Sequence, residues 1–275
     1  MPDSTFSIAP DRSSDLAGLR AQIRAIERGG DVQPATVMPF GVEALDRCLA
    51  GGGLALGRVH EVIGEARSEV RDAAPFGFAA ALVTRLMEKG GDVLWCPRGA
   101  NPHGGMLSAC GLAGLGLDPG RIIMVKTRDD VDRLWVMEEA LGCVGLTAVV
   151  AELGPARRGA QTRDTVSCRR LQLAAEASGV TGILLRPDAG MARSAIGMPE
   201  SRWRVTATAS TEGCRDWVPR WRVELLRARN GRPGEAHLTW EARRGIFHPV
   251  GSPITERHSL MIRPEFPAAT ERSAA

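Results

Sequence analysis

The sequence predicts an α/β protein with a mainly parallel central sheet covered by helices. Two observations support this: short, continuously apolar segments recur along the chain, and helix-forming segments separate them. Continuous apolar strands are typical of parallel sheets buried on both faces, whereas half-exposed strands alternate apolar and polar residues. Such alternation appears only after residue 192, which predicts an antiparallel extension at the C-terminal end.

The elements of the parallel part follow one another from residue 39. A short amphipathic turn carries Val42, Leu45 and Leu49 ahead of a glycine run. Five strands are then predicted, at residues 60–64, 92–96, 121–126, 146–153 and 181–187. Helices alternate with them, at about residues 76–89, 106–116, 129–143 and 165–179. Strands that alternate with helices in this way predict βαβ units.

Four regions are predicted along the chain. Residues 1–14 form a disordered leader rich in Ser, Asp and Pro, and residues 15–30 form an N-terminal helical arm. Residues 36–249 form the core, and residues 250–275 form a flexible C-terminal tail. In the C-terminal part of the core, segments 202–210 and 221–243 read as antiparallel strands, and NGRPGE (230–235) predicts a hairpin turn.

The composition indicates a cytoplasmic globular protein. Of 275 residues, 44% are apolar and 24% are charged, and the net charge of +3 identifies no partner. The six cysteines are scattered without a C-x-x-C pair, as expected for a reducing compartment. No run of 18 apolar residues and no secretory leader is present, so we expect no membrane association.

The first predicted strand leads into a degenerate phosphate-binding loop. In P-loop proteins the strand runs into G-x-x-x-x-G-K-[ST], whose backbone N–H groups and lysine hold the phosphates. Counted from Gly64, the positions of the glycine, the lysine and the hydroxyl residue hold Glu69, Val70 and Arg71. A loop that has an acidic residue here and lacks the lysine and the hydroxyl is unsuited to bind a nucleoside triphosphate and its magnesium.

The order of elements resembles a RecA-type core, and the whole chain resembles the inducible mutagenesis protein A (ImuA) family. The resemblance rests on FGVEALD (40–46), GGGLALGRVHEVIG (51–64) and RARNGRPGEAHLTW (227–240). It implies a bacterial, damage-induced protein of the SOS response that lacks most ATPase residues. It also implies two partners, a polymerase-like mutagenesis protein and an error-prone polymerase subunit, which together carry out translesion synthesis.

Two further positions of a RecA-type ATPase are altered. Arg98 follows the second strand, where such a core carries the general base, and arginine cannot accept a proton. Glu152 stands where the fold carries its magnesium-organising carboxylate. It is interpreted as structural or partner-facing, with a residual magnesium ligand as the alternative. We therefore expect a pseudo-ATPase without catalytic residues, cofactor or metal.

The histidines do not suggest a metal site. His60 and Glu61 are neighbours on a strand, so their side chains point to opposite faces and cannot share an ion. His103, His237 and His248 come from different elements without ligand spacing. We expect His60 to be a hydrogen-bonded core residue.

Surfaces are the remaining functional candidates. Arginine outnumbers acidic residues by 14 to 8 between residues 186 and 263, and the same region is rich in tryptophan. Both residue types are common in protein interfaces and on single-stranded DNA sites. The interaction candidates are Trp217, Trp221, Arg227 and Arg229, with Leu16, Leu19 and Ile23 on the apolar face of the arm. Inward packing of the tryptophans and of the arm is the alternative.

We therefore expect a non-catalytic adaptor in damage-induced mutagenic DNA synthesis, with a recombinase filament as a further candidate partner. The main alternative is a divergent RecA/KaiC-type ATP-binding protein that acts on single-stranded DNA in recombination or repair. A DNA-binding protein that uses the C-terminal arginines is a third hypothesis, although no clustered basic run supports it.

Overall fold

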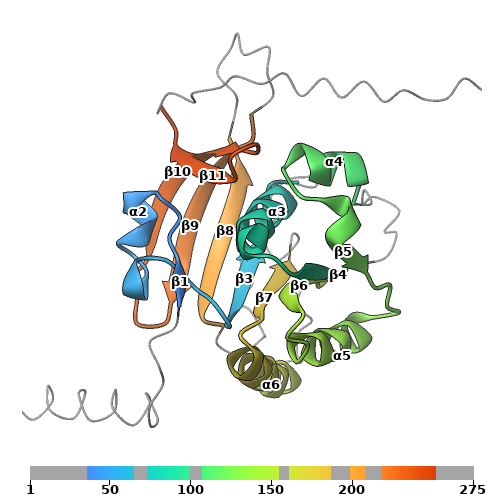
Figure 1. The fold of residues 1–275 in the computed structure, drawn as a ribbon. Helices are drawn as coiled ribbons and strands as arrows, with labels where there is room; N and C mark the ends of the chain where they lie inside the picture. The colour runs from blue at the N-terminus through green and yellow to red at the C-terminus, as the bar shows by residue number, and fades with distance from the viewer. Residues whose placement is uncertain are drawn as a thin grey trace, which may run out of the picture. The chain divides into compact units, whose positions relative to one another are not determined.

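Figure 1 shows the fold in a computed structural model. The structure describes residues 36–64, 73–98, 107–154, 161–186, 199–208 and 218–251, and for 161–166 only the helical backbone. The predicted leader and arm, and the tail beyond residue 251, lie outside these ranges, so the domain boundaries remain predictions.

A nine-stranded sheet forms the centre of the described chain. Its strand order is β11-β10-β9-β8-β3-β7-β6-β4-β5. The six strands from β8 to β5 pair in parallel, and the four from β8 to β11 pair antiparallel. The predicted α/β class is therefore confirmed. The bounds are β3 Val59–Ile63, β4 Asp92–Cys96, β5 Ile122–Met124, β6 Leu146–Glu152, β7 Thr181–Arg186, β8 Ser201–Ala207, β9 Arg220–Ala228, β10 Gly234–Glu241 and β11 Ile246–Pro249.

Strand β8 joins the two parts of the sheet. We predicted it as antiparallel, but it pairs in parallel with β3 and antiparallel with β9. Its burial alternates as that of a strand with one polar face, and this pattern is compatible with either direction. Direction is set by the partner strands, which lie far away in sequence.

Helices and turns connect the strands. The helices are α2 Glu43–Asp46, α3 Ala74–Leu86, α4 Ala109–Gly114, α5 Asp130–Leu141 and α6 Gln161–Ser178. Single turns of 3₁₀ helix lie at Ala50–Gly52, Met87–Lys89 and Pro119–Arg121, and β1 (Val37–Met38) pairs with β2 (Leu54–Ala55). Helix α4 begins later than predicted because the Ser108 hydroxyl caps it, accepting from the Gly111 N–H at 3.5 Å. The Asp129 carboxylate caps α5 in the same way, through the N–H groups of Val131 and Asp132 at 2.9 Å.

One face of the sheet carries a core built around aromatic rings. Phe78 of α3 packs among Phe40, Trp203, Trp221 and Phe247, with ring centroids 5.7–6.4 Å from its own. Trp240 and Phe247 approach to 4.7 Å. Rings at these separations add to the burial of large apolar areas, so this cluster fixes the antiparallel strands to α3.

The other face is covered by α5 and α6, which lie side by side in Figure 1. Its core is aliphatic, and its members include Val59, Met137, Val149, Leu171 and Leu184. Within the described part of the chain, no helix is both long enough and apolar enough to cross a bilayer.

Candidate functional site at the carboxyl edge of the parallel strands

The carboxyl ends of β3, β4, β6 and β7 meet at one edge of the sheet. Ligands of open α/β sheets bind outside this edge. Gly64, the last described residue after β3, donates its N–H to the Arg186 carbonyl at the end of β7, at 3.1 Å. The phosphate-loop positions Glu69, Val70 and Arg71 lie outside the described residues. The chemistry of the described edge therefore depends on the residues that end β4, β6 and β7.

Glu152, at the end of β6, is held by two hydrogen bonds. One oxygen accepts from the Trp95 indole N–H at 2.7 Å, and the other accepts from the Arg98 backbone N–H at 2.9 Å. The side chain is buried, and burial is the main reason why the pKa of Glu152 lies above its ordinary value. These contacts connect the ends of β4 and β6, so they give Glu152 a structural role.

Arg98 follows β4, as the sequence predicted, and its guanidinium lies close to the loop after β6. A Cβ on Gly154 would sit 3.3 Å from the Arg98 Cζ atom and 3.2 Å from Asp130 Oδ2, so the two side chains pack closely against this glycine. The Gly154 N–H donates to Asp130 Oδ2 at 3.1 Å. Asp130 also pairs with Arg133, which is 2% exposed. This second group of charges stabilises the edge next to α5.

A third group lies on the α6 face of the sheet. The fully buried Glu61 of β3 binds two arginines, Arg202 Nε at 2.6 Å and Arg186 Nε at 3.3 Å. Arg186 also donates from Nη1 to the Gly154 carbonyl at 2.7 Å. Sequence reasoning missed this triad. The available signal was one glutamate and one arginine inside otherwise apolar strands, because such residues are rarely buried unless paired.

The described edge carries two carboxylates paired with arginines, Glu61 and Asp130, and a third, Glu152, held by neutral N–H groups. Each of its three described carboxylates, Glu61, Asp130 and Glu152, already holds a hydrogen-bond or ionic partner. A general base needs an accessible carboxylate or imidazole close to the substrate. None of these three carboxylates is therefore without a partner in the described part of the edge.

His60 lies at the opposite end of β3 and is satisfied within the core. Its Nδ1 accepts from the Ser201 hydroxyl at 2.6 Å, and its Nε2–H donates to the Ala55 carbonyl at 2.8 Å. The Ala55 carbonyl can only accept, so Nε2 carries the proton of the neutral ring, and the Ser201 oxygen accepts in turn from the Trp203 indole N–H. Burial lowers the pKa of His60 to about 4, so the ring is neutral at pH 7. The core role predicted for His60 is confirmed.

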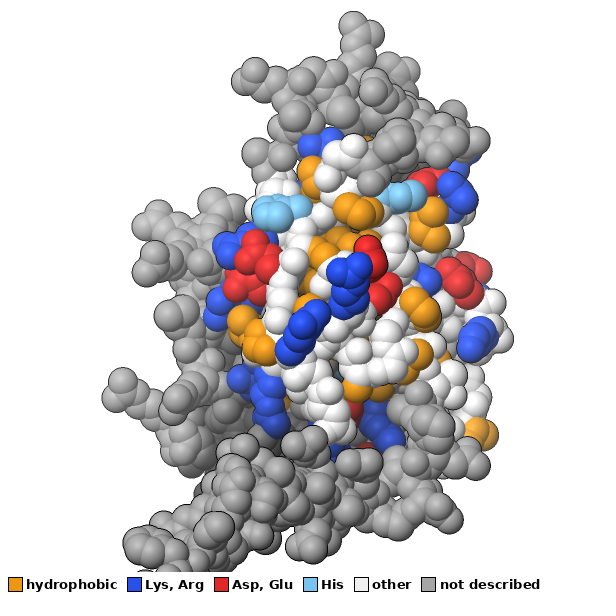
Figure 2. Space-filling view, turned by 90° about the vertical axis from the view of Figure 1, so that its left-hand side faces the viewer, with side chains coloured by type: hydrophobic (Ala, Val, Ile, Leu, Met, Phe, Trp, Pro, Cys, Tyr) orange, Lys and Arg blue, Asp and Glu red, His pale blue; other side chains and the backbone are white. Residues whose placement is uncertain are grey.

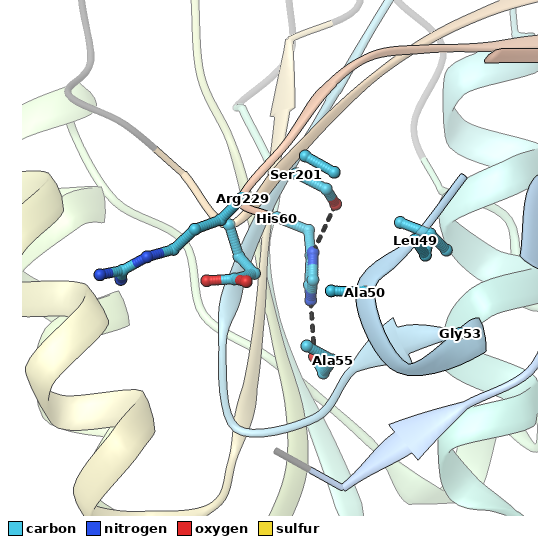
Figure 3. A pocket seen from close by; sticks show the side chains of 9 residues that line it. Leu49, Ala50, Gly53, Ala55, His60, Ser201 and Arg229 are labelled. Atoms are coloured by element: carbon cyan, nitrogen blue, oxygen red, sulfur yellow. Dashed lines mark hydrogen bonds between the residues drawn. The ribbon is translucent and has the colours of Figure 1, made fainter. Parts of the chain in front are cut away.

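His60 also borders a cavity of about 20 Å³, which Figure 3 shows between β3 and the Leu49–Gly53 turn. A cavity of this size holds about one water molecule, so it is no ligand pocket. The histidines of the C-terminal strands approach carboxylates: His237 Nε2 lies 3.5 Å from Glu235, and His248 Nε2 lies 2.8 Å from Glu241. His103 is outside the described residues, which contain no group of three side chains suited to a metal ion.

The interaction candidates of the C-terminal strands fall into two classes. Trp221 is 4% exposed and packs in the aromatic core with Trp203 and Trp240, so the surface role predicted for Trp221 is corrected to a packing role. Alternating strand residues point to opposite faces, and the tryptophans occupy the inward positions. Arg227 and Arg229, at the end of β9, are exposed. Trp217, Leu16, Leu19 and Ile23 lie outside the described residues.

Other arginines of these strands are engaged in ion pairs. Arg222 donates twice to Glu235, at 2.8 Å each, and Arg204 lies 3.2 Å from Glu224. Figure 2 shows the side of the molecule where β10 and α2 lie, and acidic and basic side chains are interspersed on its described part. This mixture differs from the continuous basic field that is typical of nucleic-acid sites.

Fold and site define the class of protein: a mainly parallel α/β domain with an antiparallel extension, in which the carboxylates at the described carboxyl edge are engaged by partners. No family model matches the chain. The chain is 41% identical over 216 residues to Protein ImuA of two strains of Caulobacter vibrioides, and the match covers 74% of this chain and 84% of each relative. The chain therefore belongs to the ImuA family, and this name indicates a part in damage-induced mutagenesis.

Proposed function

We propose that this protein is a non-catalytic, cytoplasmic adaptor of damage-induced, error-prone translesion synthesis. It would join or position polymerase components through protein–protein contacts. The observation that carries the proposal is the state of Glu152, whose two carboxylate oxygens are engaged by Trp95 and Arg98. The residue that would organise magnesium in an ATPase thus connects two strands instead.

Arg98 supports the same conclusion. It stands where the resemblance places the general base, and its guanidinium has no lone pair with which to accept a proton from water. The phosphate-loop sequence adds Glu69, Val70 and Arg71 in place of glycine, lysine and a hydroxyl residue. Loss of three separate roles is more readily explained by an abandoned activity than by one divergent loop.

The family resemblance suggests the partners: a polymerase-like mutagenesis protein, an error-prone polymerase subunit and, as a further candidate, a recombinase filament. A divergent ATP-binding protein acting on single-stranded DNA is the alternative, and it differs from the adaptor in one measurable property. It requires Mg-ATP to bind the folded chain, whereas the adaptor does not.

The test is the melting temperature of the full chain with and without Mg-ATP, together with ATP hydrolysis in the presence of single-stranded DNA. A ligand at 100 times its Kd stabilises a protein by roughly 2.7 kcal/mol, a shift of a few degrees at this chain length. We expect no shift and no turnover. A shift accompanied by turnover would establish the ATP-binding alternative.

Two variants sharpen this test. A triple variant, Glu69→Gly with Val70→Lys and Arg71→Thr, restores the phosphate loop in sequence but leaves Arg98 in place of a base. We expect it to remain without turnover. In cells, Glu152→Gln is expected to leave damage-induced mutation frequency unchanged once equal protein levels are confirmed, whereas an ATPase that uses this carboxylate would lose function.

A further inference from the structure

The turn between β9 and β10 displays exposed arginine side chains. Residues 227–233 include three arginines and no acidic residue, and Arg227, Arg229 and Arg232 are all exposed. Figure 1 shows this turn, in orange, at the lower end of the β9–β10 hairpin. Arginine is enriched in protein interfaces, and its planar guanidinium binds a carboxylate through two hydrogen bonds. The turn is therefore suited to contact an acidic group of a partner.

The backbone of this turn is held in one conformation. The Gly231 N–H donates to the Ala228 carbonyl at 3.3 Å, and Asn230 has a left-handed φ of 56°, which asparagine adopts more readily than most residues. The Arg232 N–H donates to the Cys48 carbonyl, just after α2, at 2.9 Å. A Cβ on Gly231 would lie 2.5 Å from the same carbonyl oxygen, so a larger residue would displace the turn. A turn that is already ordered loses little conformational entropy when a partner binds.

Strand β8 places further charges beside the turn. The Arg229 N–H donates to the Glu200 carbonyl at 2.8 Å, and Arg227 stands opposite Arg202 in the β8–β9 ladder. Arg202 shares the buried Glu61 with a second arginine, so this carboxylate does not compensate both charges. Like charges that face each other across two strands repel. The corner formed by β8 and the turn therefore favours the approach of a further anionic group.

We propose that the Arg227–Arg232 turn binds an acidic segment of a protein partner, whose carboxylates pair with the exposed guanidinium groups. The inference rests on the adaptor function proposed above, since it supplies a site at which such an adaptor holds its partner. Arg227 and Arg229 already take part in interactions within the chain. A guanidinium carries several N–H donors in a planar fork, however, and can bind a further carboxylate.

The surroundings of the turn favour a protein partner over single-stranded DNA. Sites for single-stranded DNA combine a basic groove with exposed aromatic side chains on which the bases stack. The described tryptophans of the antiparallel strands, Trp203, Trp221 and Trp240, are buried. Acidic and basic side chains are interspersed on the described surface near β10 and α2 (Figure 2). Such a surface suits the separate carboxylates of a peptide better than a continuous row of phosphates.

The first test is fluorescence anisotropy of the full chain at low salt, with a labelled oligoglutamate peptide and a labelled oligothymidylate of equal charge as probes. We expect the wild-type chain to bind the peptide and Arg229→Glu to raise its Kd at least roughly tenfold, because a like charge then faces the peptide. Arg243→Glu is the matched control, since it makes the same change in the exposed β10–β11 turn, and we expect an effect of less than about threefold.

Three results of this assay would overturn the proposal: no binding of the peptide, equal effects of the two variants, or tighter binding of the oligothymidylate that Arg229→Glu abolishes. Arg232→Glu separates a lost contact from misfolding, because the described contact of Arg232 with α2 uses its backbone N–H, which the substitution keeps. We expect it to weaken peptide binding at an unchanged melting temperature. Wild-type affinity in this variant would contradict the proposed site.

A test in cells connects the turn to the adaptor function. Arg229→Glu and Arg232→Glu are expected to lower damage-induced mutation frequency at equal protein levels, and Arg243→Glu is not. The peptide assay contains no nucleotide, so its result is independent of the test with Mg-ATP: binding of Mg-ATP would overturn the adaptor function and leave the anionic site in place. If the variants lose the peptide but keep the mutation frequency, the turn does not hold the partner, and the inference is wrong.

Discussion

The two faces of the central sheet are built on different principles. The face toward α3 is filled by aromatic rings and holds the antiparallel strands in place. The face toward α5 and α6 is aliphatic, contains the buried Glu61 triad, and directs apolar residues of its helices outward. The first face thus gains its stability from buried area. The second combines charge compensation inside with exposed apolar side chains outside.

This difference separates residues buried in the fold from residues exposed on its surface. Two tryptophans illustrate it: Trp203 is fully buried in the aromatic core, and Trp135 is 60% exposed on α5. Residue type alone does not distinguish these two tryptophans as interaction candidates, because only the fold determines which of them is exposed. Substitutions that act on one face and spare the other therefore test the distinction directly.

The largest effect is expected from truncating the aromatic core. Trp203→Ala should lower the free energy of unfolding by about 4 kcal/mol, since it removes a buried ring and leaves a cavity. Trp135→Ala should change the free energy of unfolding of the monomer by less than about 0.5 kcal/mol. Denaturant unfolding at low protein concentration measures both. Similar losses for the two variants would contradict the division between the faces.

A slightly smaller loss is expected inside the second face. Glu61→Gln leaves the buried Arg186 and the half-buried Arg202 without their carboxylate, and breaking a buried ion pair on one side costs about 3 kcal/mol. Glu43→Gln is the matched control, because Glu43 pairs with Arg47 at the surface. We expect the control to stay within about 0.5 kcal/mol of the wild-type protein. If Glu61→Gln is equally mild, the triad does not stabilise the edge.

The pH dependence of stability should reveal His60. Its folded pKa of about 4 lies below the ordinary 6.5, so the unfolded chain binds the proton more readily. The stabilisation is complete above pH 6.5 and is lost as the pH falls toward 4, with about 2 kcal/mol lost between pH 7 and pH 5. The measurement is the difference in unfolding free energy between these pH values, in the wild-type protein and in His60→Gln. A variant with the same pH dependence would contradict this assignment.

The smallest effect is expected at the surface of the antiparallel strands. Arg222→Gln breaks the double hydrogen bond to Glu235, yet Arg222 is 44% exposed and solvent screens the pair. We expect a loss of less than about 1 kcal/mol, which decreases further in high salt. Thermal unfolding at low and high ionic strength measures it. A loss comparable to that of Glu61→Gln would show that this surface contributes to the core.

The sequence alone predicted the strands and helices of the parallel part closely. Strand β4 has the predicted bounds, β6 and β7 end one residue earlier than predicted, and β3 is shifted by one residue. Continuous apolar segments bounded by glycine, proline or charged residues leave little freedom. The altered ATPase positions remain a prediction from the sequence, since Glu69, Val70 and Arg71 lie outside the described residues. Helix starts were less certain, as α4 shows, because capping depends on one side chain.

The tertiary structure decided which residues meet. His60 and Ser201 are 141 residues apart, and so are Glu61 and Arg202, yet each pair forms a hydrogen bond across β3 and β8. The pairing of β8, the burial of Trp221 and the contacts of Glu152 depend likewise on strands distant in the chain. Local patterns determine which segments form strands and helices because they reflect short-range preferences. Only long-range packing determines which side chains are buried, paired or left for a partner.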